Sequence, residues 1–214
     1  MRLPFDPIAR AGELWRERWG EDSRSVSMAT ATSVMRVQQL LIGQFDAIAG
    51  RHGLTFARYE ALVLLAFSRD GRLSMSRIGE RLMVHPTSAT NIVQRLAAQG
   101  LVERVPNPAD RRGAFAVITD AGREAMEAVT ADLEAVDFGL PMLDREQHEA
   151  LFALLREVRV GARDFDPGPA HRRWRASREN GAGFVGTGSG LSWWKAALSP
   201  DACPGRPADS KDTP

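Results

Sequence analysis

Cysteine, lysine and long apolar runs are all scarce in this sequence. Its single cysteine is Cys203, and its only lysines are Lys195 and Lys211. One cysteine cannot form a disulfide within the chain or build a zinc site, so we expect a reducing compartment. No apolar run of about 18 residues occurs, and the N-terminus lacks the continuous apolar stretch of a signal peptide. These absences predict a soluble, cytoplasmic protein without a membrane partner.

Motifs of catalysis and of metal binding are also missing. The four histidines lie in different predicted elements, without the spacing of metal ligands, at His52, His85, His148 and His171. No nucleophile elbow occurs, and the glycine-rich residues 186–190 lack the lysine and the flanking strand of a phosphate-binding loop. We therefore expect neither an enzyme nor a cofactor nor a bound metal ion.

Basic charge is concentrated in one segment. Over the 214 residues, 28 lysines and arginines nearly balance 27 acidic residues. Between Arg72 and Arg123, by contrast, eight arginines stand against four acidic residues, a net charge of +4. This local excess favours a nucleic-acid partner over a merely solvated surface, provided that it falls on a suitable fold.

Residues 55–119 have the pattern of a winged helix. Thr55 and Ser74 can cap two helices, and Pro86 suits the first turn of a third helix, which ends at Gly100. Two apolar strands joined by a turn follow, with the strands at 101–105 and 114–118 and the turn at 106–113. This order predicts a mainly α fold with a small two- to three-stranded β wing, a winged helix-turn-helix that can place one helix in a DNA groove.

Further helices flank this unit on both sides. The spacing of apolar residues predicts them at 8–19, 29–52, 119–136 and 144–161. Asp144 and Gln147 form a capping pair for the last helix. The long helix and the two helices after the wing carry more apolar surface than a small winged helix can cover. We expect them to pack on one another and on a second copy of the chain. The resulting dimer would hold two winged-helix units, the reading heads, about one helical turn of DNA apart or a multiple of it.

The predicted elements divide the chain into four parts. They are an N-terminal extension with a short helix (1–27), a helical dimerisation region (28–54 and 120–163), a winged-helix DNA-binding domain (55–119) and a tail (164–214). From Pro167 onward, seven glycines and six prolines fall in 48 residues, a composition that predicts disorder.

The third helix of the winged unit offers polar side chains outside its apolar stripe. These are Thr87, Ser88, Thr90, Asn91, Gln94 and Arg95. Short polar side chains near a helix N-terminus can enter a groove and reach the edges of bases. The residues at the starts of this helix and of the preceding one complete the expected DNA contacts of the helix-turn-helix, at Ser74, Ser76, His85 and Pro86.

Two sequence strings identify a family resemblance. They are Gly-Leu-Val-Glu-Arg-Val-Pro-Asn-Pro-Ala-Asp-Arg-Arg-Gly at 100–113 and Ile-Thr-Asp-Ala-Gly-Arg at 118–123. Together with the order of elements, they resemble the MarR family of bacterial transcriptional regulators over roughly residues 30–163. The resemblance implies a homodimer whose helix 86–99 enters the major groove while a wing arginine enters the flanking minor groove. It also implies that Asp110 holds an arginine in place and that either Arg111 or Arg112 inserts.

The same resemblance implies a small, often aromatic anionic effector, bound between the dimer base and the reading head, that weakens DNA binding. The N-terminal helix with Trp15 resembles the urate-responsive branch of the family. That branch, however, has an aspartate where this chain has Glu60 and an arginine near Phe67. Residues that could line an effector pocket are Trp15, Met35, Gln38, Gln39, Arg58 and Tyr59. Packing in the core or at the interface is the more common role of such residues, and we favour it.

Two other functions fit parts of the sequence. A winged helix that binds only protein would need neither the polar helix face nor the arginines at the wing tip. A peroxide sensor of this family would carry a cysteine in or near the dimer region, whereas Cys203 lies in the predicted tail. The sequence therefore favours a ligand-responsive homodimeric repressor that binds a pseudo-palindromic operator in double-stranded DNA, with a protein-interaction module as the alternative.

Overall fold

The computed structural model describes residues 3–107 and 110–168, with the backbone alone at 110–112. Two compact units divide the chain, one ending at Leu140 and the other beginning at Pro141. The predicted tail lies largely outside the described residues, and Cys203 with it. Among the helices described, none is both long enough and apolar enough to cross a membrane.

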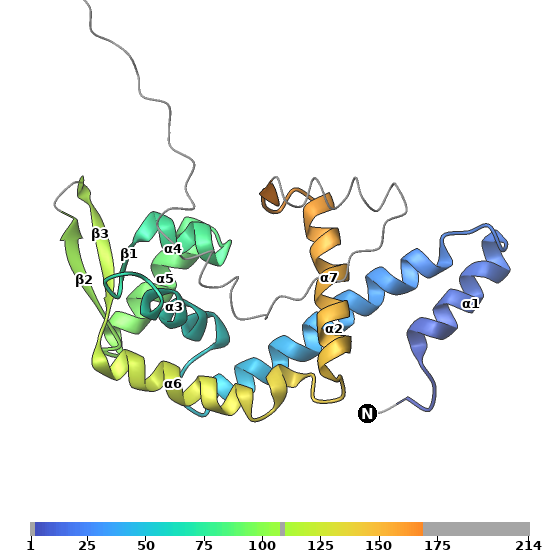
Figure 1. The fold of residues 1–214 in the computed structure, drawn as a ribbon, viewed down its shortest axis with the longest axis horizontal. Helices are drawn as coiled ribbons and strands as arrows, with labels where there is room; N and C mark the ends of the chain where they lie inside the picture. Colours follow the sequence, from blue (N-terminus) through green and yellow to red (C-terminus); the bar gives the residue numbers. More distant parts are fainter. Residues whose placement is uncertain (1–2, 108–109, 169–214) are drawn as a thin grey trace, which may run out of the picture. The chain divides into compact units, whose positions relative to one another are not determined.

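Two helices precede the predicted winged unit. Helix α1 (Pro7–Trp19) begins at Asp6, whose carboxylate accepts the backbone N–H of Ile8 at 2.8 Å. Helix α2 (Ser25–Gly50) follows after a short turn, and α1 packs alongside its first half (Figure 1). Both predicted helices are confirmed, although α2 begins four residues earlier than its apolar spacing indicated.

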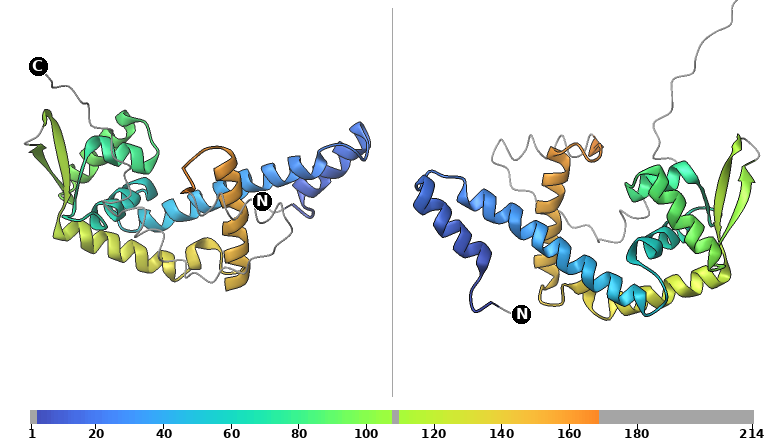
Figure 2. Two further views of the ribbon diagram at one scale, coloured as in Figure 1. Left: turned by 45° about the horizontal axis from the view of Figure 1, so that its top comes forward. Right: turned by 180° about the vertical axis from the view of Figure 1, so that it is seen from behind.

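A helix-turn-helix and a small sheet form the next part of the first unit (Figure 2). The elements in order are α3 (Phe56–Ala66), β1 (Arg72–Ser74), α4 (Met75–Leu82), α5 (Pro86–Ala98), β2 (Val102–Asn107) and β3 (Asp110–Ile118). The sheet is antiparallel in the order β1-β3-β2. The winged-helix prediction is confirmed, and β1 supplies the third strand that the sequence left open.

One face of the sheet covers the core. Leu73 of β1 lies opposite Ala116 of β3, and Val102 of β2 lies opposite Ile118. All four side chains are buried, as the two-residue alternation of a strand requires. The core is completed by fully buried side chains of the surrounding helices, namely Leu62, Leu65, Ile78, Val93, Leu96, Val129 and Leu133.

The wing is longer than the sequence indicated. The predicted turn covered 106–113, but β2 continues to Asn107 and β3 already begins at Asp110. A bulge between Pro106 and Asn107 shifts the register, so that Asn107 pairs with Asp110. The turn prediction was wrong because the strands of the wing include charged and turn-forming residues. A β-bulge accommodates the extra residue in this pairing.

Helix α6 (Asp120–Glu134) returns from the wing toward α2 and is followed by a short 3₁₀ helix, η1 (Asp137–Gly139). In the second unit, helix α7 (Arg145–Gly161) starts with the predicted capping box: Asp144 accepts the N–H of Gln147 at 2.8 Å, and the side-chain oxygen of Gln147 accepts the N–H of Asp144 at 2.9 Å. Leu154 and Val158 of this helix are exposed.

Candidate nucleic-acid interface

The turn between α4 and α5 sets the position of the candidate reading helix. Helix α4 ends at Leu82, and the next residue, Met83, adopts a left-handed conformation with φ 54°. The two helices approach closely at Gly79, where an added Cβ would lie 3.6 Å from the Cβ of Ala89. Ile78 and Val93 are fully buried, so α5 is fixed on the body by its apolar side.

His85 caps the N-terminus of α5. Its Nδ1 accepts the backbone N–H of Thr87 at 3.3 Å and lies 3.2 Å from the Thr87 hydroxyl. Because Nδ1 accepts from the backbone, the neutral ring carries its proton on Nε2. The side chain is exposed, which leaves this Nε2–H available to an acceptor such as a phosphate oxygen.

The opposite side of α5 presents polar side chains to solvent. Thr87, Ser88, Asn91, Gln94 and Arg95 are exposed, whereas Ala89, Val93 and Leu96 are buried. Thr90 is partly exposed, and its hydroxyl donates to the carbonyl of Pro86 at 3.0 Å, so only its acceptor capacity is left for a ligand. The predicted polar residues thus lie together on the outer side of one helix.

The start of α4 carries the two predicted serines. Ser74 caps this helix, with its hydroxyl accepting the N–H of Arg77 at 3.4 Å. The hydroxyl of Ser76 lies 3.2 Å from that of Ser74 and is exposed. Ser74 therefore has a structural role of its own, and Ser76 is the freer of the two.

An arginine that sequence reasoning missed lies on the outer face of the sheet. The guanidinium of Arg72 is 5.3 Å from the ring centre of Phe115 in the wing and 3.4 Å from the carboxylate of Asp70. Only the pairing of β1 with β3 brings Arg72 to the wing, so no local signal could have identified it. The predicted side chains of Asp110, Arg111 and Arg112 lie outside the described part of the chain.

The candidate effector residues have other partners in the structure. Trp15 packs on Trp19 with ring centres 4.4 Å apart, and Gln39 accepts a hydrogen bond from Arg36 at 3.2 Å. Met35 is exposed on α2, as is Gln38. Arg58 donates to the side chain of Gln99 at 3.0 Å. The contacts of these candidates therefore lie in different elements: within α1 for Trp15, within α2 for Gln39, and between α3 and the end of α5 for Arg58.

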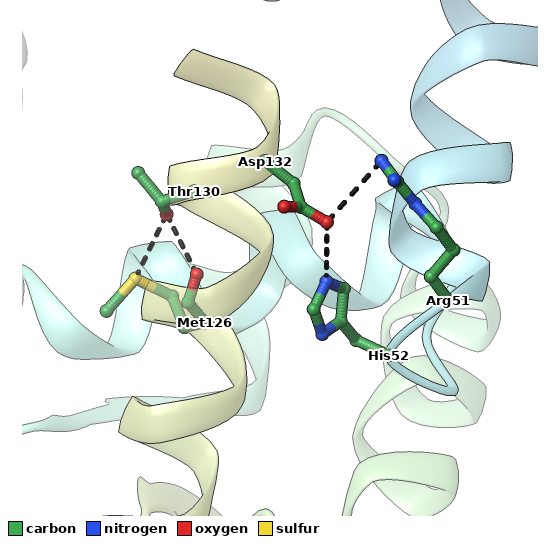
Figure 3. Close-up of polar contacts among 5 residues, drawn as sticks. All are labelled: Arg51, His52, Met126, Thr130 and Asp132. Atoms are coloured by element: carbon green, nitrogen blue, oxygen red, sulfur yellow. Dashed lines mark hydrogen bonds and ion pairs between the residues drawn. The ribbon is translucent and has the colours of Figure 1, made fainter. Parts of the chain in front are cut away.

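Tyr59, the remaining effector candidate, is part of the core. It is 6% exposed, and its hydroxyl lies 3.0 Å from that of Thr130 on α6. The Thr130 hydroxyl donates to the carbonyl of Met126 at 2.8 Å (Figure 3), so Tyr59 is the donor to Thr130. Burial raises the pKa of the Tyr59 phenol, because the ionised form would lose its hydration.

A charged cluster links the end of α2 to α6 (Figure 3). The carboxylate of Asp132 lies 2.9 Å from Nε2 of His52 and 3.4 Å from the guanidinium of Arg51. The hydrogen bond to His52 lowers the pKa of Asp132, and the charge of Arg51 adds to the effect. No group of three or more metal-ligating side chains is found in the described part of the chain.

Comparisons with known proteins agree with this architecture. Residues 52–113 match the MarR family. MhqR of Bacillus subtilis, an HTH-type transcriptional regulator, is 30% identical over 116 residues, which cover 54% of this chain and 79% of MhqR. The transcriptional repressor MdtR of the same organism is 34% identical over 86 residues, 40% of this chain and about half (54%) of MdtR.

Solved structures support the same assignment. The MarR family regulator Sco5413 from Streptomyces coelicolor is 59% identical, with a TM-score of 0.61 over 65% of this chain and 97% of Sco5413. Sco3205 from the same organism, solved in complex with DNA, is 25% identical, with a TM-score of 0.57 over 78% of this chain and 95% of Sco3205.

The fold and the exposed polar helix define a winged-helix regulator. The chain belongs to the MarR family of DNA-binding transcriptional regulators and is not an enzyme, as its sequence predicted. The narrower resemblance to the urate-responsive branch stays a prediction.

Proposed function

We propose that the protein binds a pseudo-palindromic operator as a homodimer and represses transcription until a small aromatic or anionic effector weakens the complex. The observation that carries the proposal is the placement of α5. Its apolar side is fixed in the core, and its polar side chains are exposed on the opposite side. The protein is similar to MdtR, a named repressor, and to Sco3205, which was solved bound to DNA.

Helix α5 is assigned to the major groove. A B-DNA major groove is about 12 Å wide and admits one α-helix, whose side chains can then meet base edges. The base-reading residues are Thr87, Ser88, Thr90, Asn91, Gln94 and Arg95. Ser74, Ser76 and His85 can donate hydrogen bonds to phosphate oxygens, whereas Pro86 has no N–H and is assigned an apolar contact with the DNA. Phosphate contacts fix the register of the protein, and base contacts supply specificity.

The wing is assigned to the flanking minor groove. This assignment rests on sequence, with Asp110 orienting an arginine and Arg111 or Arg112 inserting. An A·T-rich minor groove is narrow and concentrates negative potential, which favours an inserted guanidinium. Arg72, held against Phe115 at the base of the wing, adds positive charge to the same sheet.

The dimer is assigned to the helices outside the reading head. Met35 and Leu40 on α2 are 65% and 55% exposed, and Val34 and Val37 are also exposed. A soluble single chain rarely exposes so much contiguous apolar surface, so a partner is expected to cover it. We assign dimerisation to residues 28–54 and 120–163 and DNA binding to residues 55–119; the N-terminal extension (1–27) and the tail (164–214) flank these regions.

The effector is assigned to the region of α1, α2 and α3. Trp15, Gln38 and Gln39 are exposed and can contact a ligand directly, whereas Met35 belongs to the apolar surface assigned to the dimer. Arg58 and Tyr59 would act indirectly, because Arg58 is already hydrogen-bonded to Gln99 and Tyr59 to Thr130. A ligand that disrupts these two hydrogen bonds would alter how α3 is held against the end of α5 and against α6.

A mobility shift on the DNA just upstream of the protein's own gene, across a salt series, tests the function. A discrete complex that survives excess competitor DNA is expected. Arg111→Ala or Arg112→Ala should weaken it by about 1–3 kcal/mol, whichever residue makes the groove contact. Wild-type affinity in both variants contradicts the wing assignment. No binding of duplex DNA even at low salt favours the protein-interaction module.

A further inference from the structure

The segment between α2 and α3 accepts hydrogen bonds from a distant part of the chain. Gly53 lies in the turn after α2 and has a left-handed conformation with φ 71°. That carbonyl accepts from Nε2 of Gln99 at 3.0 Å and from the Arg58 guanidinium at 3.4 Å. Gln99 is 46 residues away in the sequence.

The side chains of Arg58 and Gln99 also bind one another. Nη1 of Arg58 donates to Oε1 of Gln99 at 3.0 Å, and Nε of Arg58 donates to the hydroxyl of Thr55 at 3.3 Å. Gln99 thus uses both ends of its amide, one as a donor and one as an acceptor. Because Gln99 follows directly on α5, the C-terminal end of that helix is fastened to the junction of α2 and α3.

The junction is itself anchored on its other side. His52, next to Gly53, lies 2.9 Å from the Asp132 carboxylate of α6 (Figure 3). The carbonyl that receives Gln99 therefore belongs to a segment held between α6 and α5. The hydrogen bond from Gln99 therefore connects the segment after α2 with the C-terminal end of α5.

We propose that Arg58 and Gln99 are positioning residues that fix the angle of α5 to α2, and thereby the separation of the two reading helices in the dimer. The inference rests on the proposed function, since it requires a dimer that reads two half-sites. The 13 residues of α5 span about 20 Å. A rotation of about 10° at the Gln99 end moves the N-terminal end by roughly 3 Å, close to the rise of one base pair.

Gln99→Met in the full-length protein tests the proposal, because methionine keeps the length of the side chain, removes both hydrogen bonds and changes no charge. Binding to three DNA duplexes is compared. They are the operator located by footprinting with the wild-type protein, the same operator with two base pairs inserted at its centre, and a single half-site. We expect affinity for the operator to fall roughly three- to tenfold. Affinity for the half-site should stay unchanged, and the penalty of the insertion should shrink.

Arg58→Met should act in the same direction, and the double variant should lose no more than the larger single loss. Arg10→Met is the matched control, since Arg10 binds Glu13 within α1 and joins no two elements. Equal losses on all three duplexes would mean that Gln99→Met merely lowers the folded fraction. Unchanged affinity for all three would mean that the hydrogen bonds of Gln99 do not affect DNA binding. Either result overturns the positioning role while the proposed function stands. Failure of the wild type to bind any duplex overturns both.

Discussion

Glu60 is a half-buried ionisable residue of the winged-helix domain. It lies on α3, between buried residues of that helix, and burial raises the pKa of its carboxyl. The folded protein therefore binds this proton more tightly than the unfolded chain does, for which the pKa is about 4.3. By linkage, the contribution of Glu60 to stability falls as the pH rises through the folded pKa.

Replacing Glu60 with Gln should remove this dependence. At neutral pH the Glu60→Gln variant is expected to be at least as stable as the wild type, because no charge has to be desolvated. The free energy of unfolding, measured in denaturant from pH 4 to 8, should fall less steeply with pH in the variant. Glu127→Gln, at an exposed position on α6, is the control and should follow the wild type. Parallel profiles for Glu60→Gln and wild type would show that Glu60 does not titrate in this range.

At the scale of elements, the start of α6 is fitted tightly against the end of α5. The Thr119 hydroxyl accepts the N–H of Gly122 at 3.0 Å and donates to the carbonyl of Gly100 at 2.9 Å. A Cβ on Gly122 would lie 2.2 Å from the carbonyl oxygen of Leu101, a backbone atom, and 2.9 Å from Ile118. The glycine is therefore required by close packing between the wing and α6.

Gly122→Ala should consequently destabilise the protein by about 1–3 kcal/mol, because the backbone has to shift. Gly50→Ala is the matched control, since a Cβ there meets nothing within 4 Å. That control should be neutral or stabilise the fold by up to about 1 kcal/mol, as alanine does in a helix. Thermal unfolding of the two variants measures the contrast. Similar midpoints for both would mean that α6 can move away from the wing at little cost.

At the scale of the whole molecule, the exposed apolar residues of α2 predict the dimer. Leu40→Glu places a charge in the proposed interface, where it would have to be desolvated. We expect light scattering after gel filtration to show a dimer for the wild type and a monomer for the variant, with weaker operator binding. Met83→Glu is the control, because Met83 is 72% exposed on the reading head and should leave the dimer intact. A monomeric wild type, or a dimeric Leu40→Glu variant, contradicts the assignment.

The sequence alone determined the elements whose signals are local. Thr55 and Ser74 cap the helices that they were predicted to cap, and the third helix ends just before Gly100, which has a left-handed conformation. Caps, helix ends and apolar periodicity depend on residues a few positions apart, so they can be seen without the fold. The helical period likewise indicates, from the sequence alone, which polar residues of α5 lie opposite its apolar side.

Tertiary structure decided the contacts between residues distant in the sequence. The three residues of β1 become a strand only because β3 pairs with them, and that pairing brings Arg72 to Phe115. Tyr59 and Arg58 were candidates for an effector pocket, yet the fold gives them partners on α6 and at the end of α5. Hydrogen bonds over such separations depend on how helices pack, and side-chain type alone does not indicate which partner a polar group will find.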